Sequence, residues 1–337
     1  MSEYQDRGGW QRQVYEAVKA AGVNAEAIYA RLGVPLAKVL ASDYSYPHRS
    51  AKRFWELAEQ ISGDRDVGLH AGMQHPGYRG QVLQYLHQSS ATFGEGLRRI
   101  LAYQRLLSDA QTMRLELAGE EAFIALVSIV PEIDRLRHAS EFMLFGFTRY
   151  FRDLTDGAFV ATRLDFSCAA PENIAERERS YGCPVRYDAP ENRIYFSSAL
   201  LARPSANAEP ELFQLHERIA AERLQRIASQ DFVEGVHRQI RALLESGEAR
   251  PERVAAKLGL SEVQLSSRLA DSETTFVREL DAYRYQLAKQ LLAQTDEPIS
   301  EICYLTHFSE PSAFYRAFKR WCGQTPVQYR KRRRAQD

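Results

Sequence analysis

Hydrophobic residues recur at three- and four-residue steps through most of the first hundred residues. This spacing places apolar side chains on one face of a helix and predicts four helices, at residues 10–21, 25–32, 51–62 and 92–107. Breaks rich in Gly and Pro separate them, at Gly22, Gly33-Val34-Pro35 and Tyr46-Pro47. The chain is therefore predicted to begin as a set of short packed helices.

The hydrophobic period then changes. Residues 112–117 (TMRLEL) alternate polar and apolar side chains, and a second apolar run at 122–130 follows a short turn, which predicts a β-hairpin. Further strands are predicted at 162–167, 185–187 and 193–196, and further helices at 135–154, 172–181 and 209–229. Residues 1–228 are thus predicted to form a mixed α+β domain.

Residues 229–337 are predicted to form a second, all-helical domain of short helices. The boundary at 228–231 contains no run of Pro or Gly, so a short or helical join is expected. Two stretches of this domain resemble each other: VAAKLGLSEVQLSSRL at 254–269 and ICYLTHFSEPSAFYRAF at 302–318. Each reads as a helix, a tight turn and a second helix, for which Ser261 and Ser309 are the expected N-caps. This is the helix-turn-helix layout, written twice.

A predicted helix at 274–293 separates the two copies. Twenty helical residues span roughly 30 Å, and successive major grooves on one DNA face lie about 34 Å apart. This spacing predicts a protein that places two recognition helices in adjacent grooves.

Residues 230–332 resemble the DNA-binding domain of AraC/XylS-type transcription regulators. The residues that carry the resemblance are Phe308, Ser309, Pro311, Ser312, Phe314, Arg316, Phe318, Gly323, Pro326, Tyr329 and Arg330, with Arg284, Ala288, Leu291 and Leu292 in the spacer. GDRDVGLHAG at 63–72 and YGCPVRYDAPENRIYF at 181–196 resemble the arabinose-binding-type effector and dimerisation domain of one branch of these regulators. The resemblance implies an α+β effector domain followed by an all-α domain with two helix-turn-helix motifs joined by a long helix.

The motifs also indicate which side chains contact DNA. Phe308, Phe314, Phe318 and Trp321 are expected on the buried face of the second recognition helix. Arg316 is the strongest candidate for a base or phosphate contact, since its planar fork suits guanine or phosphate oxygens. The predicted DNA-binding residues are Glu262, Gln264, Ser266, Ser267, Pro311, Ser312, Tyr315, Arg316, Lys319, Arg320 and Thr325.

Two positions depart from the family pattern. Ser266 and Ser267 stand where the family commonly has a longer polar residue and Arg, so the first recognition helix is expected to read DNA weakly. His307 replaces the turn Gly of the second motif. If this position is left-handed, the side chain costs about 1 kcal/mol; an inert turn residue and a phosphate contact are both open for it.

Charge and composition narrow the class of protein. The formal net charge is +0, but the residues from Ile299 onward include eight Lys or Arg and only three acidic residues. Most of these basic residues belong to the tail RKRRR at 330–334. Residues 231–337 carry 17 basic and 15 acidic side chains, so non-specific DNA affinity should be modest. No signal peptide, membrane span, metal-ligand spacing or cofactor motif is found, and GxSxG, HExxH, GxGxxG and P-loop motifs are absent. A cytoplasmic, non-enzymatic protein is expected, with Cys183 as a buried structural residue.

The first domain is expected to sense a small effector. An apolar cavity closed by one cation would suit an amphipathic carboxylate, such as a fatty acid or an amino-acid derivative. The candidate cations are Arg49, Arg79, Arg105 and His138. Residues 209–229 suit either a homodimer face or packing onto their own domain. On family grounds an activator that contacts RNA polymerase is favoured. A constitutive, weakly specific nucleoid or scaffold protein is the alternative, and an enzyme fused to a DNA-binding module a third reading.

Overall fold

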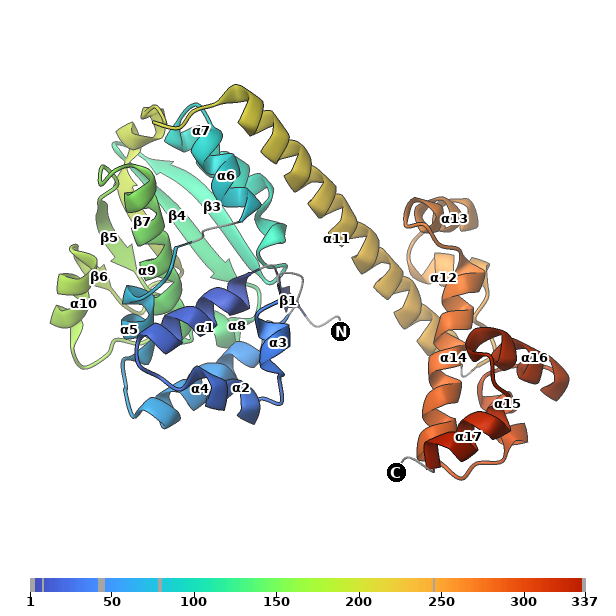
Figure 1. Cartoon of the computed structure of the whole chain (residues 1–337). Helices are drawn as coiled ribbons and strands as arrows, with labels where there is room; N and C mark the ends of the chain where they lie inside the picture. Colours follow the sequence, from blue (N-terminus) through green and yellow to red (C-terminus); the bar gives the residue numbers. More distant parts are fainter. Residues whose placement is uncertain (1–3, 8, 42–45, 78–80, 245, 335–337) are drawn as a thin grey trace. The chain divides into compact units, whose positions relative to one another are not determined.

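The computed structural model describes residues 4–7, 9–41, 46–77, 81–244 and 246–334. The chain divides into two compact units, Met1–Leu224 and Gln225–Asp337. One continuous helix, α11 (Pro210–Leu244), crosses the division (Figure 1). The join between the domains is therefore helical, as the absence of a Pro or Gly run predicts.

The first unit opens with a layer of short helices. They are α1 (Trp10–Ala20), α2 (Ala25–Arg31), α3 (Leu36–Val39), α4 (Ser50–Ser62), α5 (Val67–Met73), α6 (Val82–Ser89), α7 (Phe93–Ala102) and the 3-10 turn η1 (Gln104–Leu106). The predicted helices at 10–21, 25–32 and 51–62 are confirmed. The helix predicted at 92–107 ends at Ala102, where Tyr103 leaves the helical backbone. Val18, Ile28 and Ala58 are fully buried where α1, α2 and α4 meet, so the apolar stripes form a shared core.

A five-stranded sheet forms the second layer of this unit. Its strands are β3 (Gln111–Ala118), β4 (Glu121–Ser128), β5 (Ala161–Asp165), β6 (Val185–Arg186) and β7 (Asn192–Ser197), in the order β3-β4-β7-β5-β6. All neighbouring pairs are antiparallel except β5 and β6. A separate pair joins β1 (Gln5–Asp6) to β2 (Tyr46–Pro47). The predicted hairpin is confirmed, and its turn closes at Gly119 with φ 69°.

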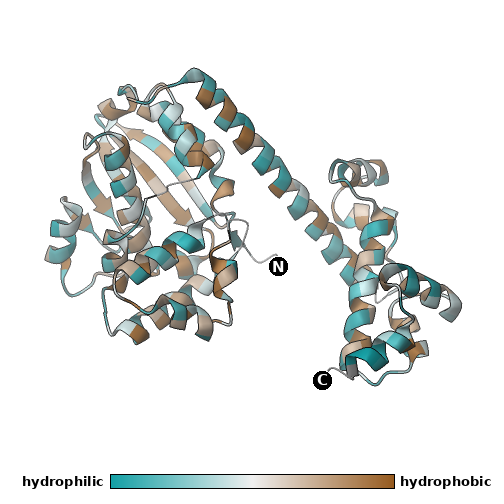
Figure 2. Ribbon diagram, viewed as in Figure 1, coloured by the Kyte–Doolittle hydropathy of each residue, from teal (hydrophilic) through white to brown (hydrophobic). Residues whose placement is uncertain are grey.

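Helices α7 and α9 (Arg137–Leu154) cover one face of the sheet (Figure 1). Alternation along β7 sends Phe196 to that face, where its ring centroid lies 6.1 Å from that of Phe93 on α7. Phe151 of α9 lies 5.5 Å from the same Phe93 ring. Figure 2 shows both hydrophobic and hydrophilic residues along the strands: β4 is buried along most of its length, whereas most positions of the edge strand β3 are exposed. On the opposite face the Arg163 guanidinium lies 3.7 Å above the Tyr195 ring. The remaining elements are α8 (Pro131–Asp134), α10 (Ile174–Tyr181) and the 3-10 helix η2 (Ser198–Ala202).

A buried ion-pair network ties α10 and α9 to the start of α5. Arg177 is fully buried, and its Nε donates to Glu141 Oε1 at 3.0 Å while its Nη2 pairs with Asp66. Arg137 Nη1 donates to the same Asp66 carboxylate at 2.7 Å. Burial alone would raise the pKa of Asp66, but the hydrogen bonds from Arg177 and Arg137 prevail and lower it to about 2. Because removing one partner would leave a buried charge uncompensated, this network is structural.

The second unit is all-helical. After α11 come α12 (Pro251–Lys257), α13 (Glu262–Asp271), α14 (Phe276–Gln294), α15 (Ile299–Leu305), α16 (Pro311–Cys322) and α17 (Pro326–Arg334). It holds two separate hydrophobic cores. One gathers Val254, Leu265 and Leu269 with the start of α14, and the other gathers Ile302, Phe314 and Phe318 with Ala288 and Leu292 near its end. The spacer helix therefore carries one helix-turn-helix core at each end, as its length predicts.

Candidate DNA interface and effector cavity

The first helix-turn-helix motif consists of α12 and α13. Leu265 and Leu269 of α13 are buried against α12 and α14, which turns the opposite side of α13 to solvent. The four residues predicted to contact DNA from this helix are all exposed: Glu262, Gln264, Ser266 and Ser267.

The start of α13 limits what Gln264 offers to DNA. Ser261 is the N-cap, as predicted: its Oγ accepts from Gln264 N at 3.2 Å, and its own N donates to Gln264 Oε1 at 2.9 Å. The Gln264 carbonyl is thus engaged, leaving its amide NH₂ available. Arg268, the cation of α13, lies 5.5 Å over the ring of Phe232. The exposed groups of this helix are thus the short hydroxyls of Ser266 and Ser267 and the longer side chains of Glu262 and Gln264.

Helices α15 and α16 form the second motif. Phe314 and Phe318 are fully buried, and Phe308 and Trp321 pack against them, as predicted for the inward face. Of the residues predicted to contact DNA here, Tyr315 is half-buried, and five are exposed on α16: Pro311, Ser312, Arg316, Lys319 and Arg320.

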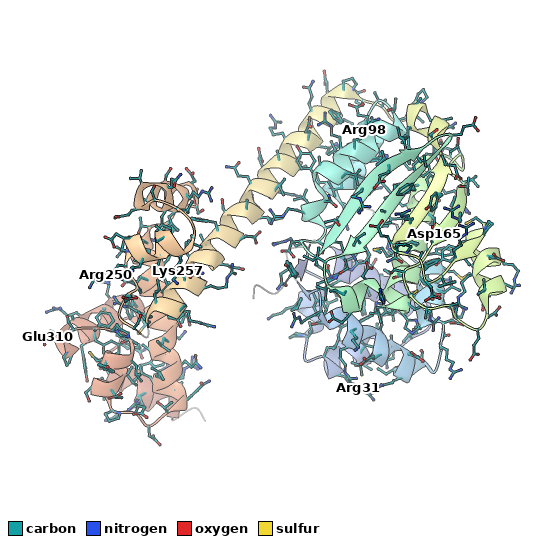
Figure 3. All side chains as sticks on the ribbon, turned by 180° about the vertical axis from the view of Figure 1, so that it is seen from behind. Arg31, Arg98, Asp165, Arg250, Lys257 and Glu310 are labelled. Atoms are coloured by element: carbon teal, nitrogen blue, oxygen red, sulfur yellow. The ribbon has the colours of Figure 1, made fainter. Side chains whose placement is uncertain are left out.

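The N-cap predicted for α16 was wrong. The cap residue is Glu310, labelled in Figure 3, and its side chain makes no capping bond; Ser309 lies one residue earlier. Pro311 occupies the first helical position, where its fixed φ and missing N–H are tolerated. The helix therefore begins at Pro311, and the cap falls on the residue directly before it.

Two predicted DNA-binding side chains are engaged within the protein. Arg320 Nη2 donates to Asp281 Oδ2 at 2.7 Å, and Trp321 Nε1 donates to the same oxygen at 3.3 Å, so Arg320 is directed toward α14. Thr325 caps α17, as predicted, with its Oγ1 accepting from Gln328 N at 3.3 Å. Either side chain would have to exchange its internal partner for a DNA group.

The turn of the second motif is left-handed at His307, with φ 52°. The predicted strain of about 1 kcal/mol therefore applies to this residue. Arg284 of the spacer braces the turn, with its Nη2 donating to the His307 carbonyl at 3.0 Å and its guanidinium 4.8 Å above the Phe308 ring. Burial lowers the pKa of Arg284. This packing explains why a spacer Arg belongs to the motif.

Cations outside the predicted set flank the first motif. Arg250 and Lys257 stand at the two ends of α12 and are both exposed (Figure 3). In helix-turn-helix proteins the first helix crosses the DNA backbone, where a cation can meet a phosphate. The sequence signal for them was available, since Lys257 lies within the motif predicted at 254–269 and Arg250 lies four residues before it.

The four cations predicted to bind an effector are dispersed. Arg49 and Arg105 are exposed, and Arg79 lies outside the described residues. His138 is buried, with its Nε2 3.2 Å from Glu59 Oε2 and its Nδ1 accepting from Gly68 N at 3.3 Å. Burial lowers the pKa of His138. The described residues do not bring these cations together around one pocket.

An enclosed cavity of about 40 Å³ lies in the first unit. Its aromatic lining consists of Trp10, Tyr46, Phe54, Trp55 and Phe142; the Phe142 ring centroid lies 5.8 Å from that of Trp10 and 5.5 Å from that of Trp55. Its polar lining consists of Asp6, Gln11, His48, Gln111, Ser128, Asp134, Ser140 and Asn192. Sequence reasoning missed this site, because its lining comes from segments far apart in the chain.

A hydrogen-bonded chain runs along one wall of this cavity. His48 Nδ1 lies 2.9 Å from Asp6 Oδ1, and His48 Nε2 lies 2.9 Å from Ser128 Oγ. The order of groups is that of a serine hydrolase triad. The described backbone N–H groups of residues 128–130 are not free to form an oxyanion hole: Ser128 N donates to Asp134 Oδ1, Ile129 N to the Ala110 carbonyl and Val130 N to Ser128 Oγ. The chain therefore suits a rigid polar wall better than acyl transfer.

The described residues offer little further chemistry beyond the DNA interface and the cavity. Within them, no group of three His, Cys, Asp or Glu side chains is arranged to hold a metal ion, and no helix has the length and apolar character needed to cross a bilayer. Cys183 is buried, as predicted, and burial raises the pKa of its thiol to about 11. A thiol with so high a pKa is a poor nucleophile at neutral pH.

Comparisons with known proteins agree with this architecture. Residues 22–205 match the family described as "Arabinose-binding domain of AraC transcription regulator, N-term", and residues 254–332 match "Helix-turn-helix domain". The chain belongs to the AraC family of transcription regulators. It is a DNA-binding regulator with an arabinose-binding-type N-terminal domain, and not an enzyme.

Similar proteins span most of the chain. The ornithine utilization regulator of Pseudomonas aeruginosa is 29% identical over 279 residues, which cover 81% of this chain and 80% of that protein. The HTH-type transcriptional regulator VirS of Mycobacterium tuberculosis is 28% identical over 271 residues, 79% of this chain and 78% of VirS. Among solved structures, the transcriptional regulator CdpR from Pseudomonas aeruginosa is 22% identical, with a TM-score of 0.43 over 91% of this chain and 96% of CdpR.

Proposed function

We propose that this regulator recognises specific DNA by placing α13 and α16 in adjacent major grooves, and that a small molecule bound by the first domain controls its activity. The main support for binding in two adjacent grooves is α14, a helix of 19 residues with one helix-turn-helix core packed at each end. Its length, roughly 28 Å, is close to one turn of DNA. A single chain can therefore read two successive grooves.

Specificity on this proposal comes mainly from α16. Arg316 is exposed on the face opposite Phe314 and Phe318, and none of the described acidic side chains pairs with it, so its guanidinium is available to a guanine or a phosphate. Lys319 is exposed near it. The serines of α13 would contribute shorter or water-mediated contacts. Arg320 and Thr325 would contact DNA only after giving up their internal partners.

The test is selection of bound sequences from random DNA by the full chain at physiological salt. Arg316→Ala should weaken binding of the selected motif by roughly 1–3 kcal/mol and relax the preference at one base position. Arg226→Ala is a matched control, since Arg226 is an exposed Arg on α11 outside both motifs. A selected motif of two half-elements about one helical turn apart supports the proposal. Binding without sequence preference, unchanged by Arg316→Ala, would instead support the nucleoid-type alternative.

For the effector, the enclosed cavity in the first unit is the favoured site. The composition expected from sequence, an apolar pocket with one cation, is found instead at an open surface hollow lined by Val160, Leu200 and Arg203. Such a hollow would leave most of a ligand in water, whereas small-molecule sites bury most of their ligand. The lining of the enclosed cavity carries two carboxylates, so it does not favour the carboxylate ligand suggested by the sequence.

Further parts of the proposal rest on the family and on one exposed face. Leu212 and Leu215 of α11 are 48% and 40% exposed, while Phe213 between them lies under Arg99 at 5.4 Å. One side of the helix thus packs on its own domain and the other offers an apolar face for a homodimer. Activation through RNA polymerase, and action in the cytoplasm where a bacterial chromosome lies, follow from the family.

A further inference from the structure

The enclosed cavity has a composition that selects for charge. Five of the lining residues are aromatic, and the faces of such rings carry negative potential that attracts cations: Trp10, Tyr46, Phe54, Trp55 and Phe142. Asp6 and Asp134 add two carboxylates, and none of the described lining residues is Lys or Arg. The site therefore has a surplus of negative groups.

Asp6 lies against an imidazole and not against a Lys or Arg. Its Oδ1 and Oδ2 are 2.9 and 3.0 Å from His48 Nδ1. Asp134 has no cationic partner at hydrogen-bond distance among the described residues; its Oδ1 accepts from Ser128 N at 2.8 Å. Burial raises the pKa of Asp134. A cation placed in the cavity would favour the ionised form of this carboxyl group.

Other polar lining groups are largely occupied. Asn192 Oδ1 accepts from Ser167 N at 3.1 Å and its Nδ2 donates to the Asp134 carbonyl at 3.2 Å, while Gln11 Oε1 accepts from Tyr29 Oη at 3.1 Å. A polyol ligand would need these amide groups to be free, because its hydroxyl groups are bound through hydrogen bonds with neutral polar side chains. A carboxylate oxygen can accept several hydrogen bonds at once, so the Asp side chains can still serve an ammonium group.

A second, smaller cavity of about 20 Å³ adjoins the first and shares Asp6, Trp10 and Gln111 with it. Its remaining lining includes the apolar side chains of Leu107, Met113 and Phe147. A water molecule needs roughly 10–15 Å³ of such space, so the two chambers together admit only a small molecule. The smaller, more apolar chamber therefore adjoins the larger, charged chamber, and Asp6 and Trp10 line both of them.

We propose that the two chambers form one effector site for a small primary amine with an apolar body. The ammonium group would lie between Asp6 and Asp134 against the rings of Trp10 and Trp55, and the body would extend toward Met113 and Phe147. This inference rests on the proposed effector-sensing function and names the ligand class. A carboxylate would meet like charges without a cation to bind it.

The test is titration of the full chain, without DNA, by calorimetry and by Trp fluorescence, since Trp10 and Trp55 line the site. The probes are n-pentylamine and 2-phenylethylamine, with 1-pentanol and pentanoate as neutral and anionic counterparts and L-arabinose as a polyol. The amines should bind at least about tenfold more tightly than the other probes, since an ammonium–carboxylate contact is charge-assisted. Tighter binding of pentanoate or L-arabinose, or no binding of either amine, would overturn the proposal.

Variants locate the site. Asp134→Asn and Asp6→Asn should each weaken amine binding by about tenfold or more, while Glu120→Gln, in the exposed hairpin turn, should not change it. Because Asp6→Asn also disturbs His48, thermal unfolding is recorded for each variant, and Asp134→Asn decides the result if Asp6→Asn unfolds. Equal amine affinity in Asp134→Asn and wild type refutes the site. Sequence-specific DNA binding is measured separately, so failure here leaves the DNA-reading proposal standing.

Discussion

Phe318→Ala should loosen the second helix-turn-helix motif and leave the first intact. Phe318 is fully buried, and its ring centroid lies 5.9 Å from that of Phe314, 5.7 Å from that of Tyr285 and 5.6 Å from that of Tyr329. Truncating a buried Phe to Ala costs about 3–5 kcal/mol, because burial is lost and a cavity remains. The first motif has a separate core, so only the contacts of α15–α17 with the end of α14 are weakened.

Hydrogen exchange of the full chain, resolved by peptide, measures this effect locally. Amides of α15 and α16 should exchange at least about a hundredfold faster, since each 1.4 kcal/mol corresponds to tenfold. Amides of α12 and α13 should keep their wild-type rates. Tyr304→Ala is the matched control, because this aromatic belongs to the same motif but is 70% exposed and should change exchange little.

Two results would contradict the reasoning. Equal acceleration in α12–α13 and α15–α16 would mean that the two cores unfold as one, through the shared helix α14. No acceleration anywhere would mean that Phe318 does not support the motif. The first result would also weaken the view that the second motif contacts DNA as a separate unit at the end of a stiff spacer.

Further perturbations test other parts of the structure. Gly323→Ala should destabilise the second motif by about 1 kcal/mol, since Gly323 ends α16 with φ 76°; urea unfolding followed by Trp fluorescence would measure it, and an unchanged midpoint would contradict the backbone argument. Asp66→Asn should destabilise the first domain at neutral pH. Because the pKa of Asp66 is lowered to about 2 in the folded state, its stabilisation is present above its unfolded pKa of roughly 4 and is lost as pH falls toward 2. Thermal unfolding between pH 7 and 2 should therefore show the wild-type advantage shrinking below pH 4, and a constant difference would refute the assignment. The double variant Leu212→Glu with Leu215→Glu should shift a dimer to monomer in analytical ultracentrifugation, whereas an unchanged sedimentation coefficient would place any dimer contact elsewhere.

The sequence by itself determined many of the local elements and the two helix-turn-helix motifs, although the short helices α3, α5, α6 and α8 were not predicted. Helix periodicity, the Ser261 and Thr325 caps and the aromatic spacing around Phe318 depend on neighbours three or four positions apart, so they can be read along the chain. The same locality explains the wrong N-cap of α16, where Ser309 was predicted although Pro311 occupies the first helical position and places the cap at Glu310.

Only the tertiary structure decided the candidate effector site and the partners of some DNA-facing side chains. His48 meets Asp6 across 42 positions and Ser128 across 80, and Asp281 engages Arg320 across 39. Such pairings depend on how strands and helices pack, and no periodicity encodes them. For this reason the effector cations predicted from sequence lie apart, while the cavity gathers carboxylates and aromatic rings from distant segments.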